Sequence, residues 1–299
     1  MQSRNLKNIL KESFWMATDS IRKNKLRSSL TLLGISIGVF SVIGVMTAIR
    51  TLESSVESGL NVFAANTFVI QKNPEFNFGG DRRKYRNRKN ITYEQYKKLK
   101  NRSKLPLLVG PVDGTSTRNV QYKGEKLKNN VDLFGGDEGT IRFYNTFLAD
   151  GRNFINDDIH FSRNVCVLGM DVVDQLFPFE DPIGKKIKID GLGYHVIGIT
   201  ERQGEAFGES KDNYIGIPIT TFIEKFSNDW SSIRIHIESP SEKLYEKTKN
   251  EVIGHLRAIR KVAPGKENDF EVVTNTEMIE QFSVFTNGIK LFALSVSII

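Results

Sequence analysis

The chain has 299 residues, with 42 lysines and arginines against 35 aspartates and glutamates, and a single cysteine. Residues 1–50 contain eight basic and two acidic side chains, a net charge of +6, so the other 249 residues add only +1 to the total of +7. The basic excess is therefore local, as expected of a segment that meets anionic lipid head groups, and it argues against a nucleic-acid-binding protein. One cysteine excludes an intrachain disulfide. Cys166 stands between two valines and is predicted to be a small buried strand residue.

Residues 28–49 form the only long stretch without a charged side chain. About 20 helical residues cross a bilayer core of about 30 Å, so we predict a transmembrane helix over residues 28–50. A cleaved signal peptide has an apolar core of about 7–15 residues and a small-residue cleavage site near the N-terminus. The stretch here is longer, starts later and leads into Arg50 without such a site. We therefore expect a retained helix.

Basic residues in front of this helix predict its orientation. Lys23, Lys25 and Arg27 stand directly before it, and only Arg50 directly after it. By the positive-inside rule the N-terminus is cytoplasmic, and the main domain is periplasmic or otherwise extracytoplasmic, on a cell (inner) membrane. The three basic side chains are the expected anchors of the cytoplasmic end.

Residues 1–27 are expected to form a cytoplasmic amphipathic segment. Its apolar residues recur at steps of three and four, which places them on one helical face. Such a helix would lie along the membrane surface with its apolar stripe in the head-group boundary. A simple membrane-proximal extension is the alternative. The residues of the stripe are Leu6, Ile9, Leu10, Phe14, Ala17 and Ile21.

Small residues repeat along the predicted transmembrane helix. Gly34 and Gly38 form a GxxxG pattern, and Gly44 with Ala48 continues it. Small side chains let helix backbones approach closely in lipid, where no hydrophobic drive brings helices together. A packing role against further helices or a second copy is one interpretation. The other is the ordinary abundance of glycine in membrane helices.

Residues 51–284 are expected to form an extracytoplasmic domain. Thr92 and Gln95 predict a capping box, in which the hydroxyl and the amide satisfy backbone N–H groups at a helix start. Residues 185–190 and 194–199 predict a hairpin around Gly191. The other expected elements are a strand at 67–71, an exposed loop at 74–90, a helix from 92 to about 100, short strands from about 107 to 200 and a short helix at 171–177.

The last third of the chain has clearer patterns. Ile233, Ile235 and Ile237 alternate with polar residues, which predicts a strand with one buried face and with His236 facing solvent. Ser239 is the expected N-cap of a long helix that ends before Pro264. A strand at 269–274 and a helix at 276–282 are expected next.

The final residues, 291–299, are all apolar or small. Nine residues are too few to cross a bilayer, so we interpret 285–299 as the start of a second transmembrane helix in a fragment of a longer protein. The alternative is an apolar strand or tail.

Motifs for chemistry are absent or incomplete in this sequence. It has no G-x-x-x-x-G-K-[ST] pattern to hold nucleotide phosphates, and Gly208 starts a stretch that lacks the closing glycine of a nucleophile elbow. The four histidines, at 160, 195, 236 and 255, have no helical spacing that predicts a zinc site. We expect no catalytic, cofactor or metal residues and no enzymatic activity. The basic residues at 82–89 are expected to form a solvated loop, with a contact to lipid phosphates or an acidic partner as the alternative.

Several stretches together resemble the permease subunits of MacB-like ABC transporters, a group that also includes lipoprotein-release and FtsX-like permeases. Residues 24–38, NKLRSSLTLLGISIG, are similar to their first transmembrane helix. Further stretches resemble the central pattern of their extracytoplasmic domain: residues 165–169, 176–177, 181–185, 194–198 and 215–218. Each stretch is weak alone, and their order and spacing make the resemblance.

The resemblance implies an α+β fold in which an extracytoplasmic domain of two parts follows the helix. Residues 51–107 and 205–282 would form a mixed α/β porter-like layer, and 108–204 a mainly β insertion. It also implies a permease subunit of an export or mechanotransmission complex, in which a separate cytoplasmic ABC ATPase binds ATP. The implied partners are that ATPase, a second permease copy in a homo- or heterodimer, the bilayer and a periplasmic adaptor. A single-pass extracytoplasmic sensor or binding module is the alternative function.

Overall fold

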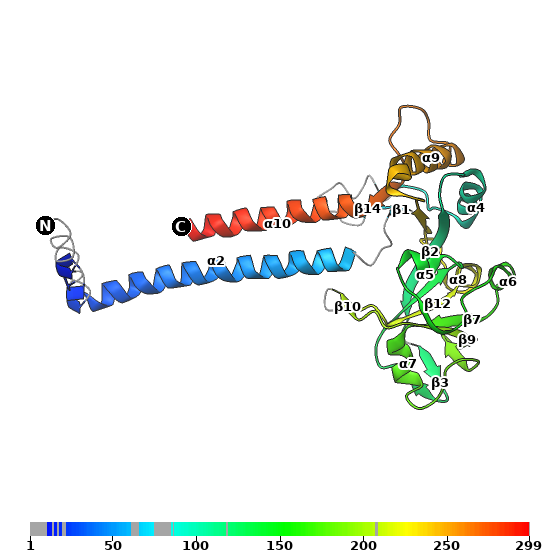
Figure 1. Ribbon diagram of the computed structural model, residues 1–299, viewed down its shortest axis with the longest axis horizontal. Coiled ribbons are helices and arrows are strands. Elements are labelled where there is room, and N and C mark those ends of the chain that lie inside the picture. The colour runs from blue at the N-terminus through cyan, green and yellow to red at the C-terminus, as the bar shows by residue number, and fades with distance from the viewer. Residues whose placement is uncertain are drawn as a thin grey trace. The chain divides into compact units, whose positions relative to one another are not determined.

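The computed structural model describes residues 11–13, 15–16, 18–19, 22–60, 66–74, 85, 87–117, 119–206 and 209–298 (Figure 1). The chain divides into two compact units. One comprises Met1–Glu53 and Ser283–Ile299, and the other, here called the ectodomain, comprises Ser54–Phe282. All six residues of the apolar stripe predicted within residues 1–27 lie outside the described residues.

Two long helices extend through the first unit. Helix α2, Lys25–Leu60, contains the predicted transmembrane helix and continues beyond it, because no proline or glycine pair interrupts residues 50–60. Helix α10, Asn275–Ile298, is one continuous helix where the sequence predicted a short helix and a separate apolar start. Among the described residues, α2 is the one helix long and apolar enough to cross a membrane, over Lys25–Thr51.

The ectodomain is built on a mixed sheet with the strand order β14-β1-β13-β2-β5-β12-β7-β9-β8-β3-β4, and β6 pairs with β9 beside this path. Most neighbours are antiparallel, whereas β12 with β5 and β7 with β9 are parallel. A separate hairpin joins β10 and β11. The strands are β1 Thr67–Gln71, β2 Leu108–Thr117, β3 Val120–Tyr122, β4 Glu125–Lys126, β5 Val131–Gly136, β6 Leu148–Gly151, β7 Val165–Leu168, β8 Lys186–Ile189, β9 Leu192–Thr200, β10 Glu205–Ala206, β11 Glu209–Ser210, β12 Tyr214–Pro218, β13 Arg234–Glu238 and β14 Glu271–Thr274.

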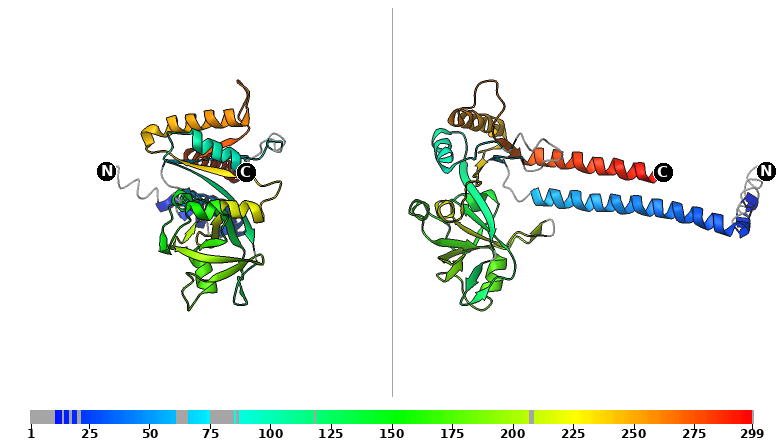
Figure 2. Two further views of the ribbon diagram at one scale, coloured as in Figure 1. Left: turned by 90° about the vertical axis from the view of Figure 1, so that its right-hand side faces the viewer. Right: turned by 180° about the vertical axis from the view of Figure 1, so that it is seen from behind.

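Six described helices accompany the sheet: α4 Tyr93–Arg102, α5 Thr140–Phe143, α6 Asn156–His160, α7 Met170–Leu176, α8 Ile219–Phe226 and α9 Glu242–Arg260. Helices α4 and α9 contact each other and lie together over one end of the sheet (Figure 2). The fold is thus the predicted α+β class.

Two hydrophobic cores stabilise the ectodomain. The connector core lies between α4, α9 and the strands β1, β13 and β14, with Phe68, Leu99 and Ile235 fully buried. The insertion core lies along β5, β7, β8, β9 and β12, with Leu133, Cys166 and Ile187 at its centre. Because β12 and α8 belong to the insertion core, this core includes residues that follow the expected boundary at 204.

Local sequence signals explain several elements. The capping box of α4 forms as predicted: Gln95 N donates to Thr92 Oγ1 at 3.3 Å, and Thr92 N donates to Gln95 Oε1 at the same distance. The hairpin of β8 and β9 also forms, with Ile189 opposite Leu192. Its two turn residues are Asp190 and Gly191, both at positive φ, a combination typical of a type I′ turn.

Two sequence predictions near β13 are wrong. Helix α9 begins at Glu242 after the N-cap Ser241, not after Ser239. The hydroxyl of Ser239 instead donates to Ser241 O at 3.0 Å and lies 3.2 Å from Thr248 Oγ1, so it fastens the strand end to the helix. His236 does not face solvent either: only 2% of its surface is exposed.

The burial of His236 follows from the cover on both faces of β13. Ile235 and Ile237 point into the connector core under α4 and α9. On the opposite face the rings of Phe143 and Tyr144 lie 5.5 and 5.4 Å from the His236 ring. Burial and the nearby Arg234 charge lower the pKa of His236 to about 3, so the imidazole is neutral at physiological pH. The alternation of apolar and polar residues in β13 could not reveal that Phe143 and Tyr144 cover its second face.

Candidate functional site: the membrane helix and the strands that connect to it

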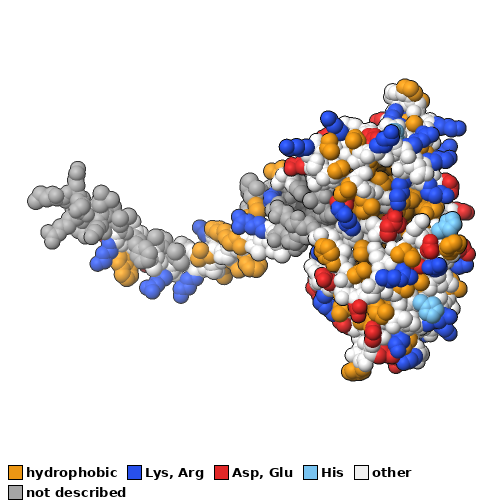
Figure 3. Space-filling view, turned by 45° about the vertical axis from the view of Figure 1, so that its right-hand side comes forward, with side chains coloured by type: hydrophobic (Ala, Val, Ile, Leu, Met, Phe, Trp, Pro, Cys, Tyr) orange, Lys and Arg blue, Asp and Glu red, His pale blue; other side chains and the backbone are white. Residues whose placement is uncertain are grey.

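The apolar side chains of α2 are exposed along the helix (Figure 3). Leu30 and Phe40 expose 61% and 78% of their surface. A helix that is apolar on every side is stable in lipid, not in water. Its hydroxyls are compatible with that environment, because Thr31 Oγ1 donates to Arg27 O at 2.9 Å and Thr51 Oγ1 to Thr47 O at 3.1 Å.

The predicted basic anchors stand at the N-terminal end of α2. Lys25 and Arg27 lie in its first turn, and Lys23 precedes it in an exposed ion pair with Asp19 at 2.6 Å. Positive charge at a helix N-terminus opposes the helix dipole. The three cations therefore do little for the helix itself, whereas anionic head groups would stabilise them.

The predicted small-residue face is open. No atom lies within 4 Å of a Cβ built on Gly34, Gly38 or Gly44, and Ala48 is exposed. Within the described residues nothing packs on this face. Its role in helix packing stays a prediction about a second helix or chain.

Strands β1 and β14 connect the ectodomain to the two long helices. β1 is the first strand after α2, and β14 ends at Thr274, directly before α10. The two strands pair antiparallel, with Phe68 opposite Thr274 and Gln71 opposite Glu271. The two connections along the chain therefore meet in one hydrogen-bonded strand pair at the edge of the sheet.

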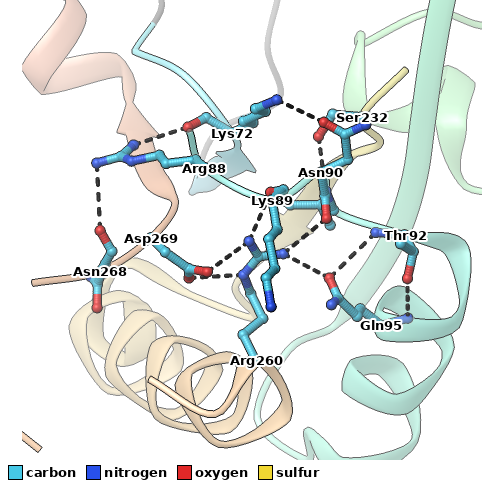
Figure 4. Close-up of polar contacts among 11 residues, drawn as sticks. Lys72, Arg88, Lys89, Asn90, Thr92, Gln95, Ser232, Arg260, Asn268 and Asp269 are labelled. Atoms are coloured by element: carbon cyan, nitrogen blue, oxygen red, sulfur yellow. Dashed lines mark hydrogen bonds and ion pairs between the residues drawn. The ribbon is translucent and has the colours of Figure 1, made fainter. Parts of the chain in front are cut away.

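Arg88 holds the far ends of this strand pair together. Its guanidinium donates to Lys72 O at 2.9 Å, just after β1, and forms an ion pair with Glu271 of β14 at 2.7 Å. It also donates to Asn268 O at 3.4 Å (Figure 4). Only 8% of its side chain is exposed. The expectation that residues 82–89 form a solvated loop is therefore wrong for Arg88, which is buried. Residues 82–84 and 86 lie outside the described residues.

Arg260 forms the centre of a second cluster, at the end of α9. Its side chain is 1% exposed and makes a bidentate ion pair with Asp269, both bonds at 2.8 Å. It also donates to Lys89 O at 2.9 Å and to Gln95 Oε1 at 2.8 Å (Figure 4). A buried guanidinium is tolerable only when its donors are used in this way. The cluster ties α9, α4 and the segment before β14 into one body.

Asp137 links the two cores. It follows β5 and accepts hydrogen bonds from Tyr96 of α4 at 3.0 Å and from Gly139 N at 3.0 Å. Burial, with the nearby Glu138 charge second, raises the pKa of Asp137 to about 6. Burial likewise raises the pKa of Tyr96 well above its usual value. This junction is consequently sensitive to pH in the acidic range.

The described residues offer little for catalysis. No group of three or more His, Cys, Asp or Glu side chains among them could hold a metal ion. Cys166 is buried, and burial raises the pKa of its thiol, so it is no nucleophile. On the face shown in Figure 3, basic and acidic side chains of the ectodomain are interspersed.

These features define an α+β domain joined to an apolar helix long enough to cross a membrane. The family model of the MacB-like periplasmic core domain matches residues 28–254. The chain therefore belongs to the MacB-like periplasmic core domain family.

Curated relatives carry the name macrolide export ATP-binding/permease protein MacB. The protein of Chlorobium phaeobacteroides is 28% identical over 283 residues, which cover 92% of this chain and 41% of the relative. That of Neisseria meningitidis serogroup A is 27% identical over 290 residues, 96% of this chain and 43% of the relative. The chain thus spans about two fifths of the length of these relatives.

Solved structures share the fold. The periplasmic region of MacB from Actinobacillus actinomycetemcomitans has a TM-score of 0.61 at 18% identity and covers 76% of this chain and 97% of its own. The extracellular domain of the ABC-type transporter YknZ from Gram-positive bacteria has a TM-score of 0.52 at 17% identity, covering 70% of this chain and all of its own.

Proposed function

We propose that this chain is part of the permease subunit of an ABC-type export or mechanotransmission complex. ATP would bind to a separate cytoplasmic ATPase, and the ectodomain would move in response. Family membership supports this class of protein. The observation that carries the mechanical part is the pairing of β1 with β14, since these strands follow α2 and precede α10 along the chain.

The proposed transmission runs through this strand pair. A change in tilt of α2 or α10 would pull on β1 or β14. Arg88 joins the segment after β1 to β14, and Arg260 ties Asp269, just before β14, to α9 and α4. The pull would therefore move the connector core as a body instead of separating the strands. Buried, multiply bonded guanidinium groups resist such separation through several directional bonds each.

The proposed setting follows from the same features. The N-terminus would lie in the cytoplasm and the ectodomain outside, with Lys23, Lys25 and Arg27 at the inner membrane surface. Gly34 and Gly38 would pack against a further helix or a second permease copy. A periplasmic adaptor is a further proposed partner.

Cysteine labelling tests the orientation, since the one native cysteine is buried. Lys11→Cys and Lys126→Cys introduce exposed thiols before α2 and in β4. In intact spheroplasts a membrane-impermeant maleimide should label the Lys126 variant only. Labelling of the Lys11 variant alone would contradict the proposed orientation and indicate the opposite one.

Co-expression tests the coupling. The complete permease, produced with an ABC ATPase encoded beside it, should co-purify with that ATPase and change its hydrolysis rate. Arg88→Gln should leave co-purification intact and weaken the change in hydrolysis rate. The exposed Arg202→Gln is the control and should behave as the wild type does in both measurements. Absence of both co-purification and any rate change would contradict the proposal. It would favour the alternative, a membrane-anchored sensor or binding module.

A further inference from the structure

A cavity of about 480 Å³ opens on one face of the ectodomain sheet. It lies over β2, β5 and β12, and the segments around Tyr144 and Gln203 close its side. Ligand pockets of proteins measure about 300–1,000 Å³ and are lined mostly by apolar groups with a few placed polar ones. None of the connections proposed above uses this cavity.

Strand register explains why the sheet is hollow here. Gly114 of β2 lies opposite Phe134 of β5, and Phe134 lies beside Gly216 of β12. A Cβ on Gly216 would stand 3.0 Å from the Phe134 ring, so a larger residue at this position would push the ring away from the strand. Gly114 leaves the neighbouring position without a side chain. With Gly114 and Gly216 on either side, the Phe134 ring lies close to the sheet, and no side chain from these two positions fills the space above it.

The floor and wall of the cavity are aromatic. The rings of Phe134 and Tyr214 lie 5.3 Å apart and those of Phe134 and Tyr144 6.4 Å apart. The Tyr214 hydroxyl is fixed by a hydrogen bond to Thr200 Oγ1 at 2.7 Å. Such a surface stacks against a flat or aliphatic body, with its rotamers already set.

Two cations line the cavity, Lys211 and Arg234. Among the described residues neither has a carboxylate within ion-pair distance. Asp113 affects Arg234 only at longer range, and the lining residue Asp132 accepts a hydrogen bond from Ser116 at 2.8 Å. Half-buried cations without a paired carboxylate are well placed to bind an anion.

Several hydrogen bonds hold the cavity wall beside Lys211 in place. Buried Asp212 accepts from Gln203 N at 2.9 Å and from Gly204 N at 2.8 Å. The Gln203 amide donates in turn to Tyr144 O at 3.3 Å and to the Thr146 hydroxyl. The same residues form the base of the β10–β11 hairpin. The cavity wall is thus fixed before any ligand arrives.

We propose that this cavity binds a small anion with an apolar or aromatic body. The body would lie on Phe134, Tyr144 and Tyr214, and the anionic group would face Lys211 and Arg234. Aromatic carboxylates and short fatty acids share this chemistry, and the test separates them.

The test measures equilibrium binding to the full chain in nanodiscs of zwitterionic lipid, with empty nanodiscs subtracted. The probes are 2-naphthoate, octanoate and the neutral 2-naphthamide. Either carboxylate should bind saturably at one site per chain, and the amide at least about tenfold more weakly. Octanoate binding alone would indicate an aliphatic ligand, and naphthoate binding alone an aromatic one.

Two independent variants address the site. Lys211→Gln with Arg234→Gln removes the charge and should weaken carboxylate binding at least about tenfold. Gly114→Leu fills the cavity, and its Cβ meets only ordinary contacts from 3.4 Å outward. Lys126→Gln, an exposed lysine of β4, is the matched control and should bind as the wild type does. Thermal unfolding checks that each variant is folded.

Three results would overturn the proposal: no saturable binding of either carboxylate at millimolar concentration, equal affinity for the amide, or undiminished binding by both the charge variant and Gly114→Leu. Since no ATPase is present, failure here leaves the proposed coupling function untouched.

Discussion

The strands β1 and β14 and the strands β7, β8 and β9 belong to one sheet, but different interactions hold them. Around β1 and β14, buried arginines bind carboxylates and backbone carbonyls from three segments of the chain, at residue 72, residues 89–90 and residues 268–271. Around β7 to β9, aliphatic and aromatic side chains fill the core, and the arginines that form ion pairs there, such as Arg163 and Arg202, are about half exposed. Hydrogen bonds and ion pairs are directional and fix the geometry of the connector core. Apolar packing is not directional, and it stabilises the insertion core mainly by the area that it buries.

The largest expected effect breaks the insertion core. Phe222 of α8 is fully buried against Gly135 of β5. Phe222→Ala should lower the free energy of unfolding by about 3–5 kcal/mol, through lost transfer energy and the cavity left behind. Urea unfolding measures this. Phe179→Ala, at a side chain 99% exposed, is the control and should change stability by less than about 0.5 kcal/mol. Equal effects would refute the assigned core.

The next effect breaks the connector. Arg260→Met should cost about 3 kcal/mol, because Asp269 and several carbonyls lose their buried donor. Arg202→Met removes a solvent-exposed arginine paired with Asp171 and should change urea unfolding little. If both variants behaved alike, the contrast between a buried and a surface arginine would not hold.

Acid titration sharpens the comparison at the junction of the two cores. The folded-state pKa of His236 is depressed from 6.5 to about 3, so its contribution to stability is lost as pH falls through that window. The folded-state pKa of Asp137 is raised from 3.8 to about 6, so its contribution is lost as pH rises through its window. The two slopes oppose each other.

Single substitutions should separate the two slopes. Asp137→Asn should steepen the loss of stability between about pH 6 and pH 4, since His236 then acts alone, at about 1.4 kcal/mol for each unit of pKa shift. His236→Phe should give a protein that gains stability as the pH falls through the same range. Urea unfolding across this range measures both. An unchanged slope in either variant would contradict its assigned group.

The smallest effect concerns a helix start in the connector. Thr92→Ala removes the hydroxyl that caps α4 and should cost about 1 kcal/mol. Ser241→Ala at the start of α9 is the matched control, because Ser241 makes no capping hydrogen bond through its side chain. Thermal unfolding compares the two. A larger loss in the Ser241 variant would show that the caps are misassigned.

Local signals in the sequence predicted local structure well. The uncharged stretch in α2, the capping box at Thr92, the hairpin at Gly191 and the buried Cys166 each depend on residues close together in the chain. Their physical causes, helix period, backbone conformation and turn chemistry, act over a few residues. The family resemblance added the α+β class.

Long-range contacts were not predictable in this way. Arg260 binds Lys89 O and Gln95, and Arg88 binds Asn268 O, pairs far apart along the chain. The run of basic residues before Asn90 therefore suggested a solvated loop. His236 was misplaced for the same reason, since its cover comes from Phe143 and Tyr144. The cavity over Phe134 depends on strand register, which no single stretch of sequence contains.

Hydrogen exchange of the complete permease, assembled with its ATPase, tests the proposed transmission most directly. Exchange reports local opening of backbone hydrogen bonds, strand by strand. With ATP bound, β1 and β14 should keep their protection, because the strand pair moves as a body, and protection should change in residues 137–143, where the connector core meets the insertion core. Loss of protection in β1 and β14, or no change anywhere in the ectodomain, would contradict the proposed transmission.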